Sequence, residues 1–179
     1  MVYVFLAEGF EEMEALAPID LLRRENIDVC TVGIGGKQIT GTHNIIITAD
    51  SDGMNLDFED VEAVVLPGGM PGAENLDKSK LVAECLEKAV KNNAVISAIC
   101  AAPMVLGRKG LLKGKKATCF PGFEQELTGA IYSGNPVEKD GKIITAKGAG
   151  AALEFALTLV SELKGKSAAD KLRENLQCV

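Results

Sequence analysis

One cysteine stands where a strand is expected to end and a helix to begin. Cys100 closes the apolar run 94–99 and is followed by the small residues Ala101 and Ala102, a pattern typical of a buried strand that turns sharply into a helix. Unpaired backbone N–H groups at a helix N-terminus favour the thiolate, which attacks electrophiles and reacts with peroxide. Cys100 is therefore the first candidate for chemistry, and a buried, inert thiol is the alternative.

Two further segments are expected at the same edge of the sheet, because open α/β sheets bind ligands beyond the carboxyl ends of their strands. The first strand-like run leads into Glu11, Glu12 and Glu14, and a later one leads into the glycine-rich loop 67–72. The loop could aim backbone N–H groups at a developing oxyanion, or its glycines could serve only a tight turn. The glutamates could take part in the chemistry or form a solvated helix face.

The other chemically interesting residues have simpler explanations. Cys85 lies on the apolar stripe of an expected helix and should be a core residue, and Cys119 could act as a resolving thiol only if it lies near Cys100. His43, the only histidine, is expected in a surface turn. The glycine-rich segment 33–36 lacks the GxGxxG spacing of a nucleotide site and is expected to be a turn.

Composition narrows the function classes. The 179 residues are 47% hydrophobic and 25% charged, which predicts a single soluble domain, 1–179, with a full core. The net charge is −6, and the sequence has no Trp and no dense run of Lys or Arg, which argues against a nucleic-acid partner. No apolar run approaches the roughly 20 residues of a membrane span, and the N-terminal run is too short for a signal peptide.

The cysteine count indicates a reducing compartment. Five cysteines are widely spaced without a CxxC pair, which argues against a disulfide framework or a structural zinc site. We therefore expect reduced thiols, a cytoplasmic location, and no metal or cofactor.

Short apolar runs alternate with longer helical patterns along the whole chain, without an internal repeat or a linker. The strand-like runs are 2–7, 27–34, 45–48, 63–66, 94–99, 115–119 and 143–146. The helical patterns are 11–24, 79–91, 101–109, 151–164 and 168–175. Strands that are apolar throughout belong to parallel sheets covered on both faces. The pattern predicts a doubly wound α/β domain with a mostly parallel sheet.

Local signals mark several helix ends. Gly165 is expected to stop a helix after Lys164, and Ser167 is expected to cap the final helix. Pro18 should kink the first helix or lie in its first turn.

Four segments together resemble the ThiJ/PfpI superfamily, and within it the protein deglycase-like branch of Parkinson-disease protein seven. They are Glu-Glu-Met-Glu-Ala at 11–15, Leu-Pro-Gly-Gly at 66–69, Ala-Ile-Cys-Ala-Ala-Pro at 98–103 and Gly-Ala-Gly at 148–150. The similarity runs from about Tyr3 to Leu163. It implies a flavodoxin-like fold of the class I glutamine amidotransferase type, and a homodimer.

The resemblance also implies a set of site residues. The reactive cysteine of the family corresponds to Cys100. Its partner carboxyl, which is protonated and hydrogen-bonds the sulfur, corresponds to Glu14. The oxyanion-hole amides correspond to Gly69 and Ala101.

Two departures from the family pattern concern histidine. Some relatives carry a His-Pro pair about twenty residues after the cysteine, where this chain has Phe120 and Pro121. Peptidase-like relatives carry histidine directly after the nucleophile, where this chain has Ala101. No cysteine–histidine pair is therefore available locally.

A simple energy comparison shows that the helix end cannot create the thiolate alone. Lowering a cysteine pKa from about 8.5 to about 5.5 requires roughly 4 kcal/mol, whereas a helix terminus supplies about 0.3–1 kcal/mol and up to roughly 2 kcal/mol. Backbone donors and a protonated Glu14 must supply the rest, since hydrogen bonds to the thiolate lower its pKa.

Three functions are compatible with this site. The first is an enzyme acting on small reactive aldehydes or glycated groups, of the glyoxalase or protein deglycase type, through Cys100 and Glu14. The second is an oxidative-stress sensor or redox-regulated chaperone that works through a sulfinate on Cys100. A peptidase or amidotransferase is the third and weakest, because both usually need a histidine base, and here only His43 from a dimer partner could supply one.

Overall fold

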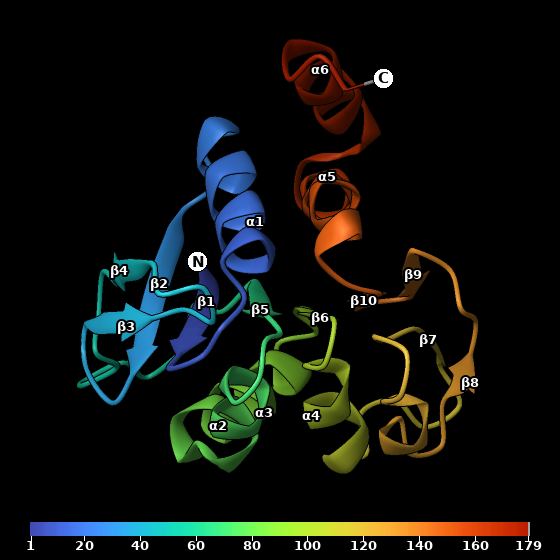
Figure 1. Cartoon of the computed structure of the whole chain (residues 1–179). Helices are drawn as coiled ribbons and strands as arrows, with labels where there is room; N and C mark the ends of the chain where they lie inside the picture. The colour runs from blue at the N-terminus through green and yellow to red at the C-terminus, as the bar shows by residue number, and fades with distance from the viewer. Residues whose placement is uncertain (179) are drawn as a thin grey trace.

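The computed structural model describes residues 1–178, and a six-stranded sheet forms the centre of this part of the chain (Figure 1). The strand order is β2-β1-β5-β6-β10-β9, parallel except for the edge strand β9, which runs antiparallel to β10. The strands are β1 Val2–Ala7, β2 Val29–Ile34, β5 Ala63–Leu66, β6 Val95–Ile99, β9 Val137–Asp140 and β10 Ile143–Ala146. Every residue of β1, β5, β6 and β10 is buried, as expected for strands covered on both faces.

Helices cover both faces of the sheet. On one face lie α1 (Glu12–Arg24) and α5 (Ala152–Lys164), with α6 (Lys166–Asn175) packed on α5, and on the other lie α2 (Gly72–Lys78), α3 (Lys80–Lys91) and α4 (Pro103–Arg108) (Figure 1). Successive residues of each strand enter opposite cores, as Val4 and Phe5 of β1 do. The predicted doubly wound, flavodoxin-like α/β fold is therefore confirmed.

Smaller elements lie outside the main sheet. They are the antiparallel pair β3 (Gln38–Thr40) and β4 (Ile46–Thr48), the parallel pair β7 (Lys116–Ala117) and β8 (Ile131–Tyr132), and the 3-10 turns η1 (Glu124–Glu126) and η2 (Ala149–Ala151). No helix within residues 1–178 is both long enough and apolar enough to cross a membrane.

The sequence missed some elements and misplaced others. It did not predict α2, which is short and polar, or β9, whose residues Val-Glu-Lys-Asp are only partly buried at the sheet edge. Ser167 does not cap α6, because the helix begins one residue earlier, after Gly165. Gly165 does end α5 with a φ of 92°, as predicted. Pro18 lies in the interior of a continuous α1, beyond its first turn.

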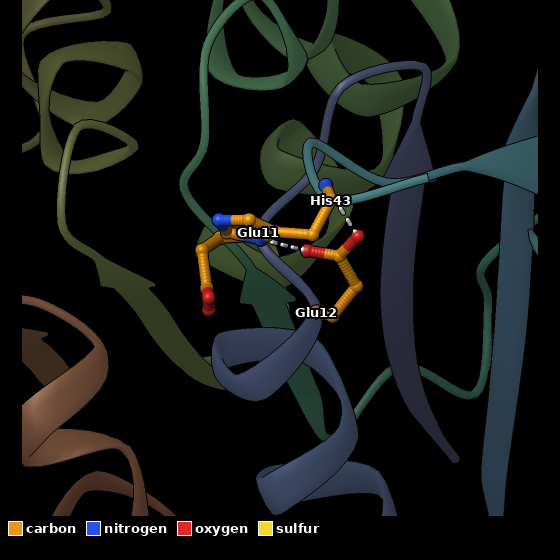
Figure 2. Close-up of side chains that lie close together, drawn as sticks. All are labelled: Glu11, Glu12 and His43. Atoms are coloured by element: carbon orange, nitrogen blue, oxygen red, sulfur yellow. Dashed lines mark hydrogen bonds and ion pairs between the residues drawn. The ribbon is translucent and has the colours of Figure 1, made fainter. Parts of the chain in front are cut away.

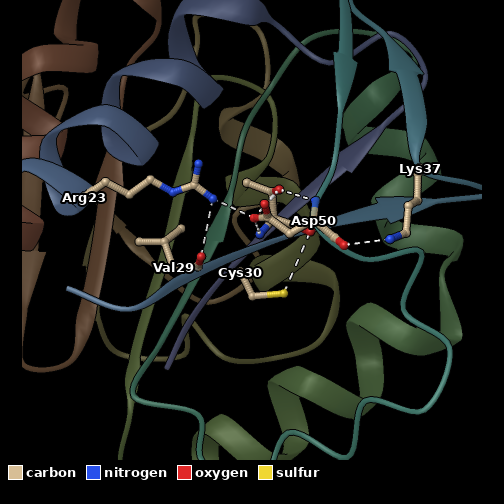
Figure 3. A network of polar contacts seen from close by, with 6 residues as sticks. Arg23, Val29, Cys30, Lys37 and Asp50 are labelled. Carbon is tan, nitrogen blue, oxygen red and sulfur yellow. Dashed lines mark hydrogen bonds and ion pairs between the residues drawn. The ribbon is translucent and has the colours of Figure 1, made fainter. Parts of the chain in front are cut away.

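A network around Asp50 ties β2 to the segments on either side of it (Figure 3). The Asp50 carboxylate accepts hydrogen bonds from Arg23 at 2.6 Å and from the hydroxyl and N–H of Thr31 at 2.7 and 2.8 Å. Lys37 donates to the Asp50 carbonyl at 2.9 Å. Cys30 lies beside this network, where burial and then the charge of Asp50 raise its pKa. A raised pKa keeps Cys30 in the unreactive thiol form.

Candidate active site

Cys100 occupies a strained turn at the carboxyl end of β6. Its φ is 65°, in the left-handed region that residues other than glycine adopt only at a cost. Its N–H donates to the carbonyl of Ala146 at 2.9 Å, and its own carbonyl accepts from the N–H of Phe120 at 2.8 Å. Neighbouring segments on both sides therefore hold the turn in place.

The helix after Cys100 begins later than the sequence predicts. α4 starts at Pro103, rather than at Ala101, and has only 6 residues. Ala101 and Ala102 form a turn between strand and helix. The helix dipole therefore contributes even less to the thiol than the sequence argument allows.

Glu14 reaches the same place from the first turn of α1. Its side chain is buried, and its Oε2 accepts a hydrogen bond from the N–H of Gly68 at 3.0 Å. Glu11 caps the helix by accepting from the N–H of Glu14 at 2.8 Å, and the N–H of Glu11 donates to the carbonyl of Gly68 at 3.0 Å. These bonds lock the start of α1 to the glycine loop and bring the Glu14 carboxyl against Cys100.

The glycine loop has no room for side chains at this point. A Cβ on Gly68 would lie 2.5 Å from the Cβ of Cys100 and 2.6 Å from Oε2 of Glu14. Gly69 has a φ of 85°, and its N–H, together with that of Ala101, hydrogen-bonds the sulfur of Cys100. The loop therefore turns tightly and also points a backbone donor at the sulfur.

The protonation of Cys100 and Glu14 is coupled. Burial raises the pKa of Glu14 to about 7. It outweighs the hydrogen bonds with Cys100 and with the backbone of Gly68 and Ala149, which act to lower this pKa. Burial, and then the charge and hydrogen bond of Glu14, raise the pKa of Cys100 to about 12. This direction is opposite to the one that the sequence predicts for the thiol, because desolvation and an anionic neighbour outweigh the backbone donors.

One proton shared between the two groups resolves this conflict. An ionised Glu14 disfavours the thiolate, but a proton held on Glu14 removes the repulsion and offers the sulfur a hydrogen-bond donor. The reactivity of Cys100 therefore depends on where the pair keeps its proton, and much less on the helix terminus.

A cavity of about 450 Å³ opens beside the pair. Its lining residues are Phe120, Pro121, Pro136, Lys147, Gly148, Ala149, Gly150 and Ala151. A Cβ on Gly148 would lie 3.3 Å from the Phe120 ring and 4.0 Å from Oε1 of Glu14, so this wall of the cavity extends to the pair. In the sequence, 148–150 contributes only to the family resemblance and is not predicted to line a cavity; its small residues directly before a helix were the available signal.

Glu12 has a different environment from Glu14, although it is only two residues away. It is buried, and its carboxylate accepts from the N–H of His43 at 2.7 Å and contacts Nδ1 of His43 at 2.8 Å (Figure 2). Thr42 donates to the same carboxylate at 3.3 Å. Burial acts to raise the pKa of Glu12, but the hydrogen bonds from the side chain and backbone of His43 lower it to about 2.

These contacts bear on two sequence-level expectations. The solvated-face interpretation is wrong for Glu12 and Glu14, since both are buried. Glu11, Glu12 and His43 place atoms that could bind a metal ion within 4.8 Å of one another. Both Glu12 oxygens, however, already accept hydrogen bonds from the loop that carries His43. The peptidase and amidotransferase interpretations gain no local base, because His43 is exposed and its Nδ1 contacts Glu12 rather than Cys100.

All five cysteines are free thiols. Within residues 1–178, Cys100 is the one whose sulfur hydrogen-bonds a carboxyl group. Cys85 is fully buried in the core, as predicted. Cys119 is also fully buried, and burial raises its pKa to about 11.

Comparison with known proteins gives a consistent result. The DJ-1/PfpI family model matches residues 1–162. The chain is 37% identical to the Parkinson disease protein 7 homolog of Danio rerio, a match covering 97% of this chain and 94% of the relative. It is 36% identical to protein dj-1beta of Drosophila melanogaster, with the same two coverages.

Solved structures agree. Oxidized DJ-1 of Toxoplasma gondii superposes with a TM-score of 0.94 at 32% identity, covering 98% of this chain and 97% of that one. Drosophila melanogaster DJ-1beta gives a TM-score of 0.93 at 34% identity, covering 99% and 97%. From these matches and the fold that they share, the chain belongs to the DJ-1/PfpI family.

Proposed function

We propose that this chain is a stress-defence protein that acts on small reactive carbonyls, as a glyoxalase or protein deglycase, through Cys100 and Glu14. The observation that carries the proposal is the buried carboxyl of Glu14 against a thiol held in a strained turn. Both groups lie beside a cavity large enough for a small ligand. The pair offers a nucleophile and a proton carrier without histidine.

The geometry supports a defined first step. The Cys100 thiolate adds to an aldehyde carbon, so that a C–S bond forms and the carbonyl π electrons move to oxygen. That oxygen takes the proton of Glu14 and is stabilised by the N–H groups of Gly69 and Ala101. The product is a hemithioacetal beside an ionised Glu14.

For a 2-oxoaldehyde, the same two residues can complete the reaction. The Glu14 carboxylate removes the proton from the carbon bonded to sulfur and returns it to the adjacent carbon, while the hydroxyl proton of the hemithioacetal passes to the oxygen on that adjacent carbon, giving a thioester of the 2-hydroxy acid. Water then adds to the acyl carbon, the C–S bond breaks, and the proton released returns to Glu14, which restores the thiolate and the protonated carboxyl. One carbon is oxidised and its neighbour is reduced, so no external oxidant is required.

Replacing the sulfur tests this proposal. In Cys100→Ser, conversion of methylglyoxal to lactate should fall at least roughly a hundredfold, because Glu14 cannot make a serine alkoxide of comparable nucleophilicity. Cys30→Ser is the matched control, since Cys30 is half-buried but lies in the Asp50 network, and it should retain wild-type turnover. Equal turnover by Cys100→Ser and wild type would rule out the proposed reaction.

A second candidate is an oxidative-stress sensor or redox-regulated chaperone. Cys100 is only half-buried, and the N–H groups that hydrogen-bond its sulfur could also bind the oxygens of a sulfinate. In this reaction the thiolate consumes two peroxide molecules and yields the sulfinate and two waters. One structural relative is described as oxidized DJ-1.

Mass spectrometry after mild peroxide treatment distinguishes this candidate. Cys100 should be the first thiol to gain two oxygens, ahead of the half-buried Cys30 and Cys178. Prior oxidation of either of those thiols would contradict it. A disulfide between Cys100 and Cys119 would instead indicate a resolving thiol.

We further propose that the protein acts as a cytoplasmic homodimer. A groove of about 710 Å³ runs between α1 and the start of α5, and the exposed apolar side chains of Met13, Leu16, Ile45 and Leu153 line it. Such a surface favours burial against a second copy. Light scattering should give twice the chain mass, and Leu16→Lys should shift it to the monomer.

A further inference from the structure

The cavity beside Cys100 and Glu14 contains one charged side chain, that of Lys147. Every other lining residue is uncharged. Lys147 is half-buried, and its ammonium donates to the carbonyl of Gly134 at 3.4 Å. Within residues 1–178 it forms no ion pair, whereas Lys115, Lys139 and Lys142 each contact a carboxylate. A partly desolvated, unpaired cation in an apolar wall favours an anionic ligand.

The same wall carries the positive end of a helix. Residues 148–151 line the cavity and lead directly into α5, a helix of 13 residues. The 3-10 turn η2 precedes α5, and its backbone bonds already engage the N–H groups of Ala151 and Ala152, while the N–H of Ala149 bonds to Glu14. The helix therefore contributes mainly the positive end of its dipole to this wall. Gly150 is exposed, and a Cβ there would meet no atom within 4 Å. Lys147 and the start of α5 therefore offer positive charge on one wall.

We propose that this cavity binds a carboxylate of the substrate, with Lys147 as the specificity residue. The preferred substrate class would then be 2-oxoaldehydes that carry a carboxylate a few carbons from the reacting carbonyl. The carbonyl would lie at Cys100, the carbon chain against Phe120 and Pro121, and the carboxylate at the ammonium of Lys147, near the positive end of α5. This inference rests on the proposed carbonyl chemistry and specifies its substrate.

Two matched compounds test the charge preference directly. In 4,5-dioxopentanoate and 2-oxopentanal the reacting groups are the same, and a carboxylate in the first replaces a methyl group in the second. Wild type should have the higher kcat/KM for the anionic compound. In Lys147→Met, kcat/KM for the anion should fall about tenfold, the scale of one charge-assisted hydrogen bond, while kcat/KM for 2-oxopentanal should change less than about twofold.

Two further variants separate a specific role from a structural one. Lys147→Arg keeps the charge and should restore most of the preference. Lys91→Met removes an exposed lysine on α3 and should leave both rate constants unchanged. If Lys147→Met lowers kcat/KM for both compounds equally, or changes neither, the inference is wrong although the carbonyl chemistry stands.

A binding measurement keeps the two proposals apart. 4-Oxopentanoate lacks the aldehyde, so it should bind without reacting and shift the amide resonances of 148–151 in wild type but not in Lys147→Met; pentan-2-one should shift neither. If wild type turns over neither dioxo compound but still shows these shifts, the proposed reaction fails and the anion site stands. If the shifts are absent or identical in both proteins, the anion site fails.

Discussion

Glu12 and Glu14 lie two residues apart in the first turn of α1, both are buried, and their pKa values move in opposite directions. Glu12 accepts hydrogen bonds from the side chain of His43 and from backbone N–H groups of the same loop, and these lower its pKa to about 2. Glu14 meets the sulfur of Cys100 and two backbone N–H groups, and its pKa is raised to about 7.

The difference shows that burial alone does not decide the role of a carboxyl. Desolvation raises the pKa of both residues, more strongly for the deeper Glu14, whereas at Glu12 the donors from the loop that carries His43 outweigh it. Glu12 stays ionised and holds a loop. Glu14 can carry a proton near neutral pH, which suits proton transfer to and from a substrate. The predictions below test whether these two roles are separable.

The largest expected effect is on turnover. Glu14→Gln removes the proton carrier and should lower methylglyoxal turnover about 10²- to 10⁴-fold. Glu12→Gln, at the neighbouring buried carboxyl, should keep turnover within about threefold at a temperature where it is folded, since no reacting atom touches it. Steady-state kinetics on both variants give the comparison.

Alkylation of Cys100 provides the mechanistic control for Glu14→Gln. The amide is neutral at every pH, so the thiol pKa in this variant should fall below the value of about 12 that an ionised Glu14 imposes. Iodoacetamide rates against pH report this value. A thiol pKa that stays as high as in wild type would show that Glu14 has no influence on the sulfur.

The second largest effect should come from the glycine between the two groups. Gly68→Ala would place a Cβ 2.5 Å from that of Cys100 and 2.6 Å from Oε2 of Glu14, and should cost about 1–3 kcal/mol of unfolding free energy and reduce turnover at least about tenfold. Gly150→Ala is the open-site control for thermal melting, because a Cβ there meets nothing within 4 Å. Unchanged melting of Gly68→Ala would show that the site relaxes freely.

The sequence predicts the main sheet and the long helices because they depend on local periodicity. The sequence does not predict elements whose structure depends on tertiary contacts. α2 is a short polar helix that packs on other elements, and β9 is a charged edge strand that needs only one neighbour. Neither produces a hydrophobic pattern that distinguishes it from a loop.

In the candidate site, too, the local pattern predicts some features and tertiary contacts determine others. The corner position of Cys100 is readable from a run of apolar residues that ends at a thiol. The burial of Glu14 is not, since a run of acidic residues at a helix start usually faces water. Only the long-range bonds from Gly68 and to Cys100 distinguish Glu14 from Glu11. The effect of burial on the thiol, which raises its pKa while Glu14 is ionised, is not readable either, because desolvation is a property of the packed structure.

Removal of the Glu12 carboxylate should destabilise the fold more than removal of an ordinary surface carboxylate. Glu12→Ala removes the acceptor for the N–H of His43 and the hydroxyl of Thr42, and should lower the free energy of unfolding by about 1–3 kcal/mol. Chemical denaturation measures this change. Glu62→Ala is the control, because its ion pair with the N-terminus is exposed and should contribute less than about 1 kcal/mol.

The pH dependence of stability should have opposite signs for the two carboxyls. The raised pKa of Glu14 gives a contribution that is present below about 4.5 and is lost as pH rises through about 7. The lowered pKa of Glu12 gives a contribution that is present above about 4.5 and is lost as pH falls towards about 2. The advantage of wild type over Glu14→Gln should therefore shrink with rising pH, and its advantage over Glu12→Gln with falling pH. Unfolding curves from pH 3 to pH 8 that show the same trend for both would refute the assignment.

The smallest effect should be a shift in the titration of His43. The hydrogen bond to Glu12, and then the charge of Glu12, raise the pKa of this imidazole, although the ring is exposed. Because His43 is the only histidine, a single NMR imidazole signal reports it without ambiguity. Its pKa should return towards about 6.5 in Glu12→Gln and stay raised in Glu14→Gln. Since a raised histidine pKa stabilises the fold only at pH values below it, His43→Ala should lower the melting temperature slightly at pH 5.5 and not at pH 9. A His43 pKa that follows Glu14 instead would mean that the two glutamates act as one cluster.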